Sequence, residues 1–334
     1  MDDVVVINNN FFQTFFLLIF VFSFPIQLKA EVKEALVIGN SNYSFSPLKN
    51  PINDAKSISV ELKKLNYNIY TVYDASIDKI KGAIDGFCEK SKKNSGVYLF
   101  YYAGHAFQIE GKNFIIPIDF SAVEEKSVYD QSICVDEIVE KLSLNVLNTN
   151  IVILDACRTS PYDKDENNYV GKDRAIRSLT NAFSRNGLSP MKGSSGTFIA
   201  FSTSPGRPAF DGKGDNGLYT KYLLKYLTAR HLTIEEIFKK VRISVLEESE
   251  RQQIPWERSS LLSDFYFIPP SKEVLAKKNV RELLQEVRID VDARRYGLAY
   301  KRLMLLNKMA QSEDDIEQIH HLIKVLRKEL RVEN

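Results

Sequence analysis

Cysteine and histidine are both scarce in this chain, which has three cysteines and four histidines among its 334 residues. So few cysteines in a chain of this length exclude a disulfide-stabilised scaffold, because such scaffolds place several bridges in a short domain. The cysteines are Cys88, Cys134 and Cys157, and in an exported protein an odd number leaves at least one free thiol or a bridge to another chain.

An excess of charge of either sign is also missing. The chain has 45 Lys and Arg against 43 Asp and Glu, which gives a formal charge of +2. We therefore expect no nucleic-acid partner, because neither the net charge nor any basic run interleaved with aromatics supports one. A composition of 44% hydrophobic and 26% charged residues is typical of a globular protein with one large domain or two small ones.

One strongly apolar run is present near the N-terminus, in "FFQTFFLLIFVFSFPIQLKA". An apolar core followed by a small residue is typical of a secretory signal peptide, here residues 1–30 with cleavage after Ala30. The usual basic leader is replaced by acidic residues. The alternative is a membrane anchor through residues 11–28, although Gln13 and Pro25 interrupt the span of about 20 apolar residues that a bilayer requires. We expect a protein exported to the periplasm or secreted.

Apolar, β-rich segments alternate with segments of helical periodicity. This alternation predicts an α/β fold with a mostly parallel sheet of about six strands and helices on both faces. A hairpin is expected at 107–117, turning at Glu110-Gly111, and the residues 264–267, "DFYF", are expected to form a last strand. Asn53 is the expected N-cap of the first helix. The expected strands are 35–39, 68–74, 96–104, 149–156 and 196–204, and the expected helices are 53–65, 76–90, 135–144, 217–227 and 233–248.

Two segments stand apart from this pattern. Residues 158–195 form a long polar loop of the kind that is functional or disordered in compact domains. Beyond Pro269-Pro270 the chain is highly charged and has helical periodicity, which predicts two or three amphipathic helices. We therefore expect one domain over 31–269, with a first part to about 160 and a second part at 196–268, followed by a helical extension over 270–334.

Two of the expected strands end in reactive side chains. The strand 96–104 leads to His105, and the strand 149–156 leads to Cys157. Ligands of such sheets bind at the carboxyl ends of the strands, where an imidazole beside a thiol can act as base and nucleophile. A buried cysteine is more often inert packing, and this is the interpretation we give to Cys88 and Cys134.

The residues around this pair carry a family resemblance. "YYAGHA" and "LDACR" place His105 at a distance of 52 residues before Cys157, and this resembles the caspase-like cysteine peptidases. "ALVIGNSNY", "LKNPINDA", "NFIIPID", "FSTSPGRPAFDGKGDNGLYT" and "QQIPWERSSLLSDFYF" are similar to the bacterial members called orthocaspases, which are related to metacaspases. The resemblance covers about 34–268. It implies a caspase-like three-layer sandwich and a cysteine endopeptidase.

The resemblance also implies roles for neighbouring residues. Animal caspases have Gln two residues before the catalytic Cys, and here that position is Asp155. By the metacaspase pattern, Asp155 and Asp54 form an acidic S1 pocket, which selects Lys or Arg before the cleaved bond. Either acid can instead be structural, Asp54 through the dipole of its helix. By the same resemblance, the N–H groups of Cys157 and Ala106 hold the oxyanion. The family usually has Gly at the position of Ala106.

The remaining expectations concern cofactors and partners. We expect no cofactor. Calcium is the alternative, because Asp119 and Asp136 lie near the sequence positions where metacaspases have their acidic calcium ligands, although the paired acids expected at those positions are missing. The expected partner is a protein or peptide with a basic P1 residue. Basic residues within 158–195 predict self-cleavage there, with a flexible lid as the alternative. The alternative function is a catalytically silent caspase-fold scaffold that binds a protein partner through its helical tail.

Overall fold

The computed structural model describes residues 32–121, 125–157, 191, 195–204, 214–269, 280–309 and 313–329. The expected signal segment 1–30 lies outside these residues, as does the loop 158–195 apart from residues 191 and 195. Within the described ranges, no helix combines the length and apolar character that a membrane span requires.

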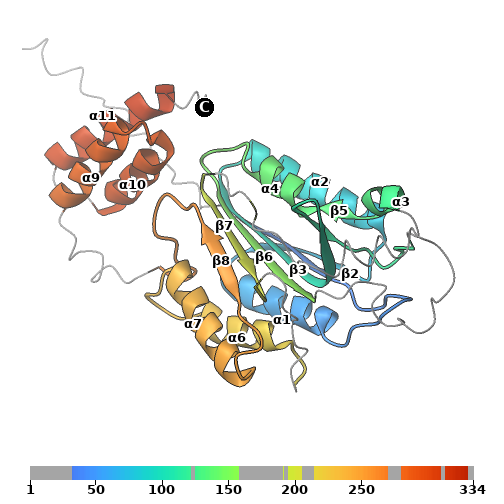
Figure 1. The fold of residues 1–334 in the computed structure, drawn as a ribbon. Helices are drawn as coiled ribbons and strands as arrows, with labels where there is room; N and C mark the ends of the chain where they lie inside the picture. The colour runs from blue at the N-terminus through green and yellow to red at the C-terminus, as the bar shows by residue number, and fades with distance from the viewer. Residues whose placement is uncertain are drawn as a thin grey trace, which may run out of the picture. The chain divides into compact units, whose positions relative to one another are not determined.

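The centre of the fold is a mixed β-sheet (Figure 1), and its main path runs in the order β2-β1-β3-β6-β7-β8. Neighbouring strands from β2 to β7 are parallel, and β8 is antiparallel to β7. A short antiparallel extension, β4 and β5, continues from β3. The strands are β1 Val32–Gly39, β2 Asn68–Tyr73, β3 Gly96–Ile109, β4 Lys112–Ile115, β5 Ile133–Cys134, β6 Thr149–Cys157, β7 Thr197–Phe201 and β8 Trp256–Ser259.

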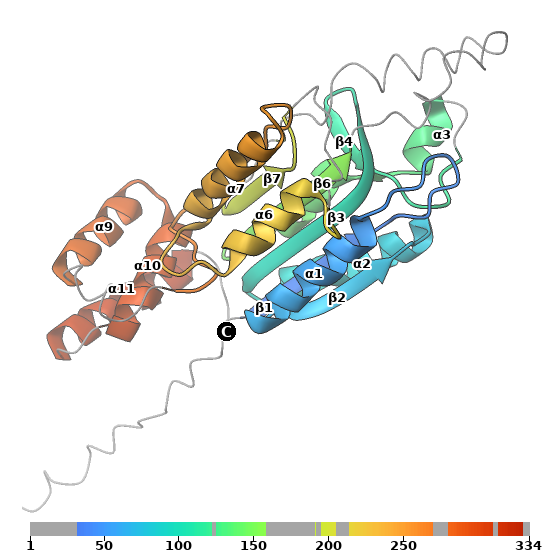
Figure 2. The same cartoon turned by 90° about the horizontal axis from the view of Figure 1, so that it is seen from below.

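Helices cover both faces of the sheet, as the two views in Figures 1 and 2 show. Side chains of β3 alternate between the two faces, because successive residues of a strand point to opposite sides. Tyr98 and Phe100 pack toward α2 and α4, while Leu99 and Tyr101 pack toward α1, α6 and α7. The predicted α/β fold class is thereby confirmed. The helices around the sheet are α1 Pro51–Lys64, α2 Ile77–Lys93, α3 Glu125–Asp130, α4 Val135–Leu142, α6 Leu218–Leu227 and α7 Ile234–Glu248.

The strand β3 is longer than the sequence pattern predicts. It continues through His105 to Ile109 and turns back into β4 at Glu110 and Gly111, whose φ angles are 50° and 80°. The predicted hairpin is thus confirmed. Because β4 pairs with the end of β3, His105 lies inside a strand instead of following one.

Two local predictions are wrong. Helix α1 begins at Pro51, so Asn50 and not Asn53 is its N-cap, in keeping with the preference of proline for the first helical position. Residues 264–267 form no strand, and β8 takes the antiparallel position at the end of the sheet. The main-chain oxygen of Phe265 instead accepts a hydrogen bond from Ile234 at the start of α7, at 2.9 Å.

The C-terminal extension contains the helices α9 Val280–Asp292, α10 Tyr296–Met309 and α11 Glu313–Glu329. Their apolar faces form a buried cluster of residues that all belong to the extension. Asp290 is buried there and lies 2.7 Å from a guanidinium nitrogen of Arg295 and 3.0 Å from one of Arg302. The periodicity therefore correctly predicted amphipathic helices in this segment.

Candidate active site

The register of the two central strands places His105 opposite Cys157. Strands β3 and β6 are parallel, and His105 and Cys157 are the last paired residues of their ladder. The point where strand order reverses lies beside this pair, between β1 and β3, because β1 has β2 on one side and β3 on the other. Open α/β sheets bind their ligands at such a point. Two residues far apart in sequence thus share one position at the edge of the sheet.

The His105 imidazole is held in a defined orientation. Its Nε2 lies 2.8 Å from the main-chain oxygen of Ser46. A carbonyl oxygen only accepts hydrogen bonds, so Nε2 carries the proton. In the neutral ring, Nδ1 is then the nitrogen with a lone pair, which a general base requires.

Asp155 lies in the same strand as Cys157, two residues before it, and its carboxylate is hydrogen-bonded to a side chain of α6. The Thr220 hydroxyl donates a hydrogen bond to Asp155 Oδ2 at 2.7 Å. The Tyr101 hydroxyl lies 2.6 Å from Thr220 Oγ1, and because the Thr220 proton is committed to Asp155, Tyr101 is the donor of this second bond. A chain of hydroxyls from β3 through α6 therefore fixes one oxygen of the Asp155 carboxylate.

Asp54 is held by the segment that precedes α6. Its Oδ1 accepts hydrogen bonds from the side-chain amide of Asn216 and from the Gly217 N–H, both at 2.9 Å. These bonds give Asp54 more than the role of a first-turn acid, because they tie α1 to a segment 163 residues away.

The two carboxylates converge on one position. A Cβ atom built on Gly217 would lie 3.1 Å from Asp54 Oδ2 and 3.7 Å from Asp155 Oδ2. Burial raises the pKa of Tyr101 well above its ordinary value, and the negative charges of Asp155 and Asp54 raise it further. Asp54 and Asp155 therefore both lie beside Gly217, where a larger residue would crowd the two carboxylates.

The other expected residues, Ala106, Asp119 and Asp136, have contacts of their own. The methyl group of Ala106 packs in the buried cluster between the sheet, α2 and α4. Asp119 accepts a hydrogen bond from Ile77 N at the start of α2, at 3.0 Å, and Asp136 accepts one from Asn113 N at 2.9 Å. Across the residues that the structure describes, His, Cys, Asp and Glu side chains form no group of three that could hold a metal ion.

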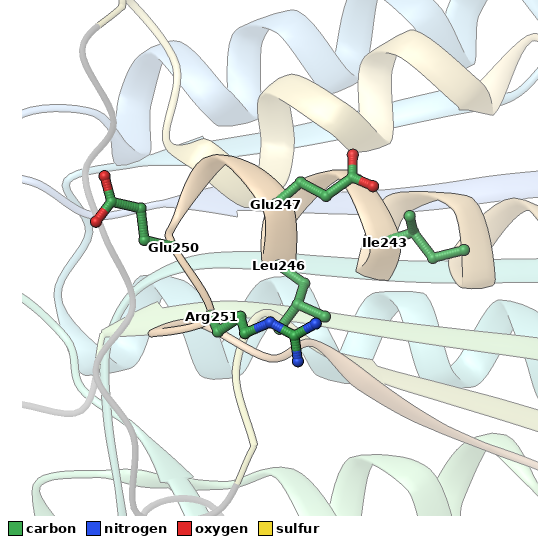
Figure 3. A pocket seen from close by; sticks show the side chains of 5 residues that line it. All are labelled: Ile243, Leu246, Glu247, Glu250 and Arg251. Carbon is green, nitrogen blue, oxygen red and sulfur yellow. The ribbon is translucent and has the colours of Figure 1, made fainter.

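An open depression on the surface lies elsewhere, at the end of α7. Figure 3 shows the side chains that line it, which are Ile243, Leu246, Glu247, Glu250 and Arg251. None of the residues with an expected catalytic or substrate-binding role lines it.

Comparison with known proteins agrees with this arrangement. A family model described as the caspase domain of peptidase family C14 matches residues 32–266. The chain belongs to the caspase-domain family. The matched range covers the whole sheet and the helices on its two faces, so the caspase domain accounts for every element that contributes to the site. Membership places this protein in a peptidase family.

Two curated proteins are similar to part of this chain. Mucosa-associated lymphoid tissue lymphoma translocation protein 1 of Homo sapiens is 32% identical over 131 residues. Its homolog in Mus musculus is 31% identical over 131 residues. The similarity covers 39% of this chain and 15% of each relative, so the chain matches a small part of much longer proteins.

Sequence reasoning missed the residues that hold the expected ones. Ser46, Asn216, Gly217 and Thr220 have no periodicity or chemical signature of their own. Asn216, Gly217 and Thr220 do fall within the family-like stretch "DGKGDNGLYT", which was the one signal that could have drawn attention to them.

Proposed function

We propose that this protein is an endopeptidase in which Cys157 is the nucleophile and His105 the general base, and that it cleaves after Arg or Lys. The observation that carries the proposal is the register match of His105 with Cys157, together with the Nε2 bond to Ser46 that leaves Nδ1 as the basic nitrogen.

The proposed reaction begins when His105 Nδ1 takes the proton of the Cys157 thiol. The thiolate attacks the peptide carbonyl, and the N–H groups of Cys157 and Ala106 stabilise the negative charge that develops on its oxygen. The carbon–nitrogen bond then breaks, the imidazolium returns the proton to the leaving amine, and a thioester remains on Cys157. Water, activated by His105, hydrolyses the thioester and restores the thiol.

Specificity is assigned to Asp155 and Asp54. Two carboxylates that lie beside the same glycine favour a cationic side chain, and the planar guanidinium of Arg can bind oxygens of both acids. The support is the position of both Oδ2 atoms around Gly217 and the fixed orientation of each carboxylate.

The test is a panel of fluorogenic peptides that differ only at P1, with Arg, Lys, Asp or Ala. We expect wild type to cleave the Arg and Lys peptides, and Cys157→Ala and His105→Ala to lose at least a thousandfold in kcat/KM. Cys88→Ala is the matched control, because Cys88 is a buried thiol of α2 with no part in the proposed reaction. Preferred cleavage after Asp would contradict the acidic pocket, and retained activity in Cys157→Ala would contradict the mechanism.

A further inference from the structure

Strand β1 ends before β3 does, so the main chain around His105 has no hydrogen-bonding partner from β1. The ladder between β1 and β3 stops at Gly39 and Ala103. One more bond follows, from Asn40 N to the Ala103 oxygen at 3.0 Å. Buried main-chain groups beyond that point need other partners, because an unpaired buried N–H or C=O is costly.

Two tyrosine hydroxyls supply those partners together with the Ile116 N–H, which donates to the His105 oxygen at 3.0 Å. The His105 N–H donates to Tyr43 Oη at 3.1 Å, and Tyr102 Oη donates to the His105 oxygen at 2.7 Å. The hydroxyls lie 3.0 Å from each other, and each lies within hydrogen-bonding distance of the Ile116 oxygen. With Tyr43 donating to Ile116, both hydroxyl protons have an acceptor. The pair thus replaces β1 as the hydrogen-bonding neighbour of the His105 peptide unit.

The fit around this pair is tight. Gly104 has a φ of 155°, and a Cβ atom built on it would lie 2.5 Å from Tyr43 Oη and 2.6 Å from Tyr102 Oη. The hydroxyls therefore lie directly against the main chain that precedes His105. Burial raises the pKa of Tyr43 far above its ordinary value, so its hydroxyl stays protonated.

The same segment after β1 also contacts the imidazole. The Tyr43 ring centroid is 4.5 Å from that of His105, and the Phe45 centroid is 5.4 Å from it. The next residue, Ser46, accepts the Nε2 bond described above. Main chain, ring faces and Nε2 of one histidine are thus all contacted from residues 43–46.

We propose that Tyr43 and Phe45 are positioning residues for His105: Tyr43 fixes its main chain in place of β1, and both rings set the imidazole plane so that Nε2 meets Ser46. This inference rests on the proposed role of His105 as the base. A base held in one orientation by surrounding contacts needs no reorganisation when the substrate arrives, and small displacements of such a group are costly in rate.

The first experiment removes a single oxygen. Tyr43→Phe keeps the ring but leaves the His105 N–H without its acceptor, and we expect kcat for the Arg peptide to fall tenfold to about a hundredfold with little change in KM. Tyr98→Phe is the matched control: Tyr98 is equally buried in β3, and its hydroxyl bonds to the Lys90 and Asn94 oxygens at the other end of the strand. This control should keep the wild-type kcat.

The second experiment reads the imidazole directly. In protein with ¹⁵N-labelled histidine, the neutral His105 ring should give the signals of the Nε2-protonated tautomer, assigned by their loss in His105→Ala. In Tyr43→Phe we expect these signals to shift toward a mixture of tautomers. Phe45→Leu, which keeps every hydrogen bond, should lower kcat several-fold, and it decides the question if Tyr43→Phe does not fold.

The outcomes separate the two proposals. If Tyr43→Phe folds, a wild-type kcat together with an unchanged tautomer overturns the positioning role alone. If Tyr43→Phe does not fold, a wild-type kcat in Phe45→Leu has the same meaning. Retained cleavage by His105→Ala overturns the proposed function itself, whatever the tyrosine variants show.

Discussion

At the scale of single residues, the surroundings of Cys88 and Cys134 lower the reactivity of both thiols. Cys88 packs in the cluster between the sheet and α2, and burial raises the pKa of its thiol to about 11. Burial also raises the pKa of Cys134. A raised pKa leaves less thiolate at neutral pH, so both thiols are poor nucleophiles. Neither Cys88 nor Cys134 is therefore expected to compete with the proposed nucleophile.

The proposed specificity depends on one missing side chain. Gly217→Ala places a methyl group against Asp54 Oδ2 and near Asp155 Oδ2. We expect kcat/KM for Arg and Lys peptides to fall about tenfold or more, because the methyl group fills the space that a cationic side chain would occupy. Gly214→Ala is the control in the same segment, since a Cβ atom there meets nothing within 4 Å. Equal cleavage of Arg peptides by the two variants would contradict this location of the S1 pocket.

At the scale of elements, the sequence predicted the helices and strands that have a local pattern of apolar residues. It did not predict the features that depend on packing against other elements. The continuous apolar run of β3 and the spacing of apolar residues in α2 are local patterns, and both elements formed there, although β3 continues five residues beyond its predicted end at 104. The segment 264–267 has strand-like residues, but Phe267 is buried by packing against the helices α6 and α7 of that face, which no local pattern records. The position of His105 depends in the same way on residues 43–46.

The candidate site was predicted to a similar depth. His105, Cys157, Asp155 and Asp54 were identified from their motifs, and the structure brings each pair together. The hydrogen-bonding partners of the two acids come from α6 and the segment before it. Those partners were beyond prediction because the bonds join residues 65 and 163 positions apart.

One partly buried carboxylate predicts a pH dependence of stability. Asp136, in the first turn of α4, accepts the Asn113 N–H of β4, and burial raises its pKa above the ordinary 3.8. The folded state then binds this proton more tightly than the unfolded state, so the stability of the protein falls as pH rises from 3.8 through the folded pKa. We expect Asp136→Asn to remove this fall, as measured by urea unfolding between pH 3.5 and 7. A difference between variant and wild type that is constant with pH would contradict it.

At the scale of the whole molecule, the described residues are organised around separate cores. Two clusters lie on opposite faces of the sheet, and a third, smaller one surrounds Phe114 and Phe120 beside the β4 extension. The helices α9, α10 and α11 bury a cluster made of their own residues. A hydrophobic core made of residues from one segment indicates that this segment packs as a separate unit.

This organisation predicts the effect of a truncation. A chain that ends at Pro269 keeps all elements matched by the caspase-domain family, and we expect it to fold and to cleave the Arg peptide with kcat/KM within about threefold of the full chain. Circular dichroism and the same peptide assay measure this. A truncated chain that folds but has lost its activity would assign the helical extension a part in catalysis.

The bond between Asp54 and Gly217 has a consequence for the time at which this protein acquires its specificity. The partners are 163 residues apart, and the ribosome adds roughly 5–20 residues per second, so Asp54 emerges roughly 8–30 s before its donors exist. Both His105 and Cys157 are also made before residue 217. In the proposed enzyme, the nascent chain therefore carries its reactive groups before it can recognise a basic residue, and biosynthesis itself delays cleavage until residue 217 of 334 has been made.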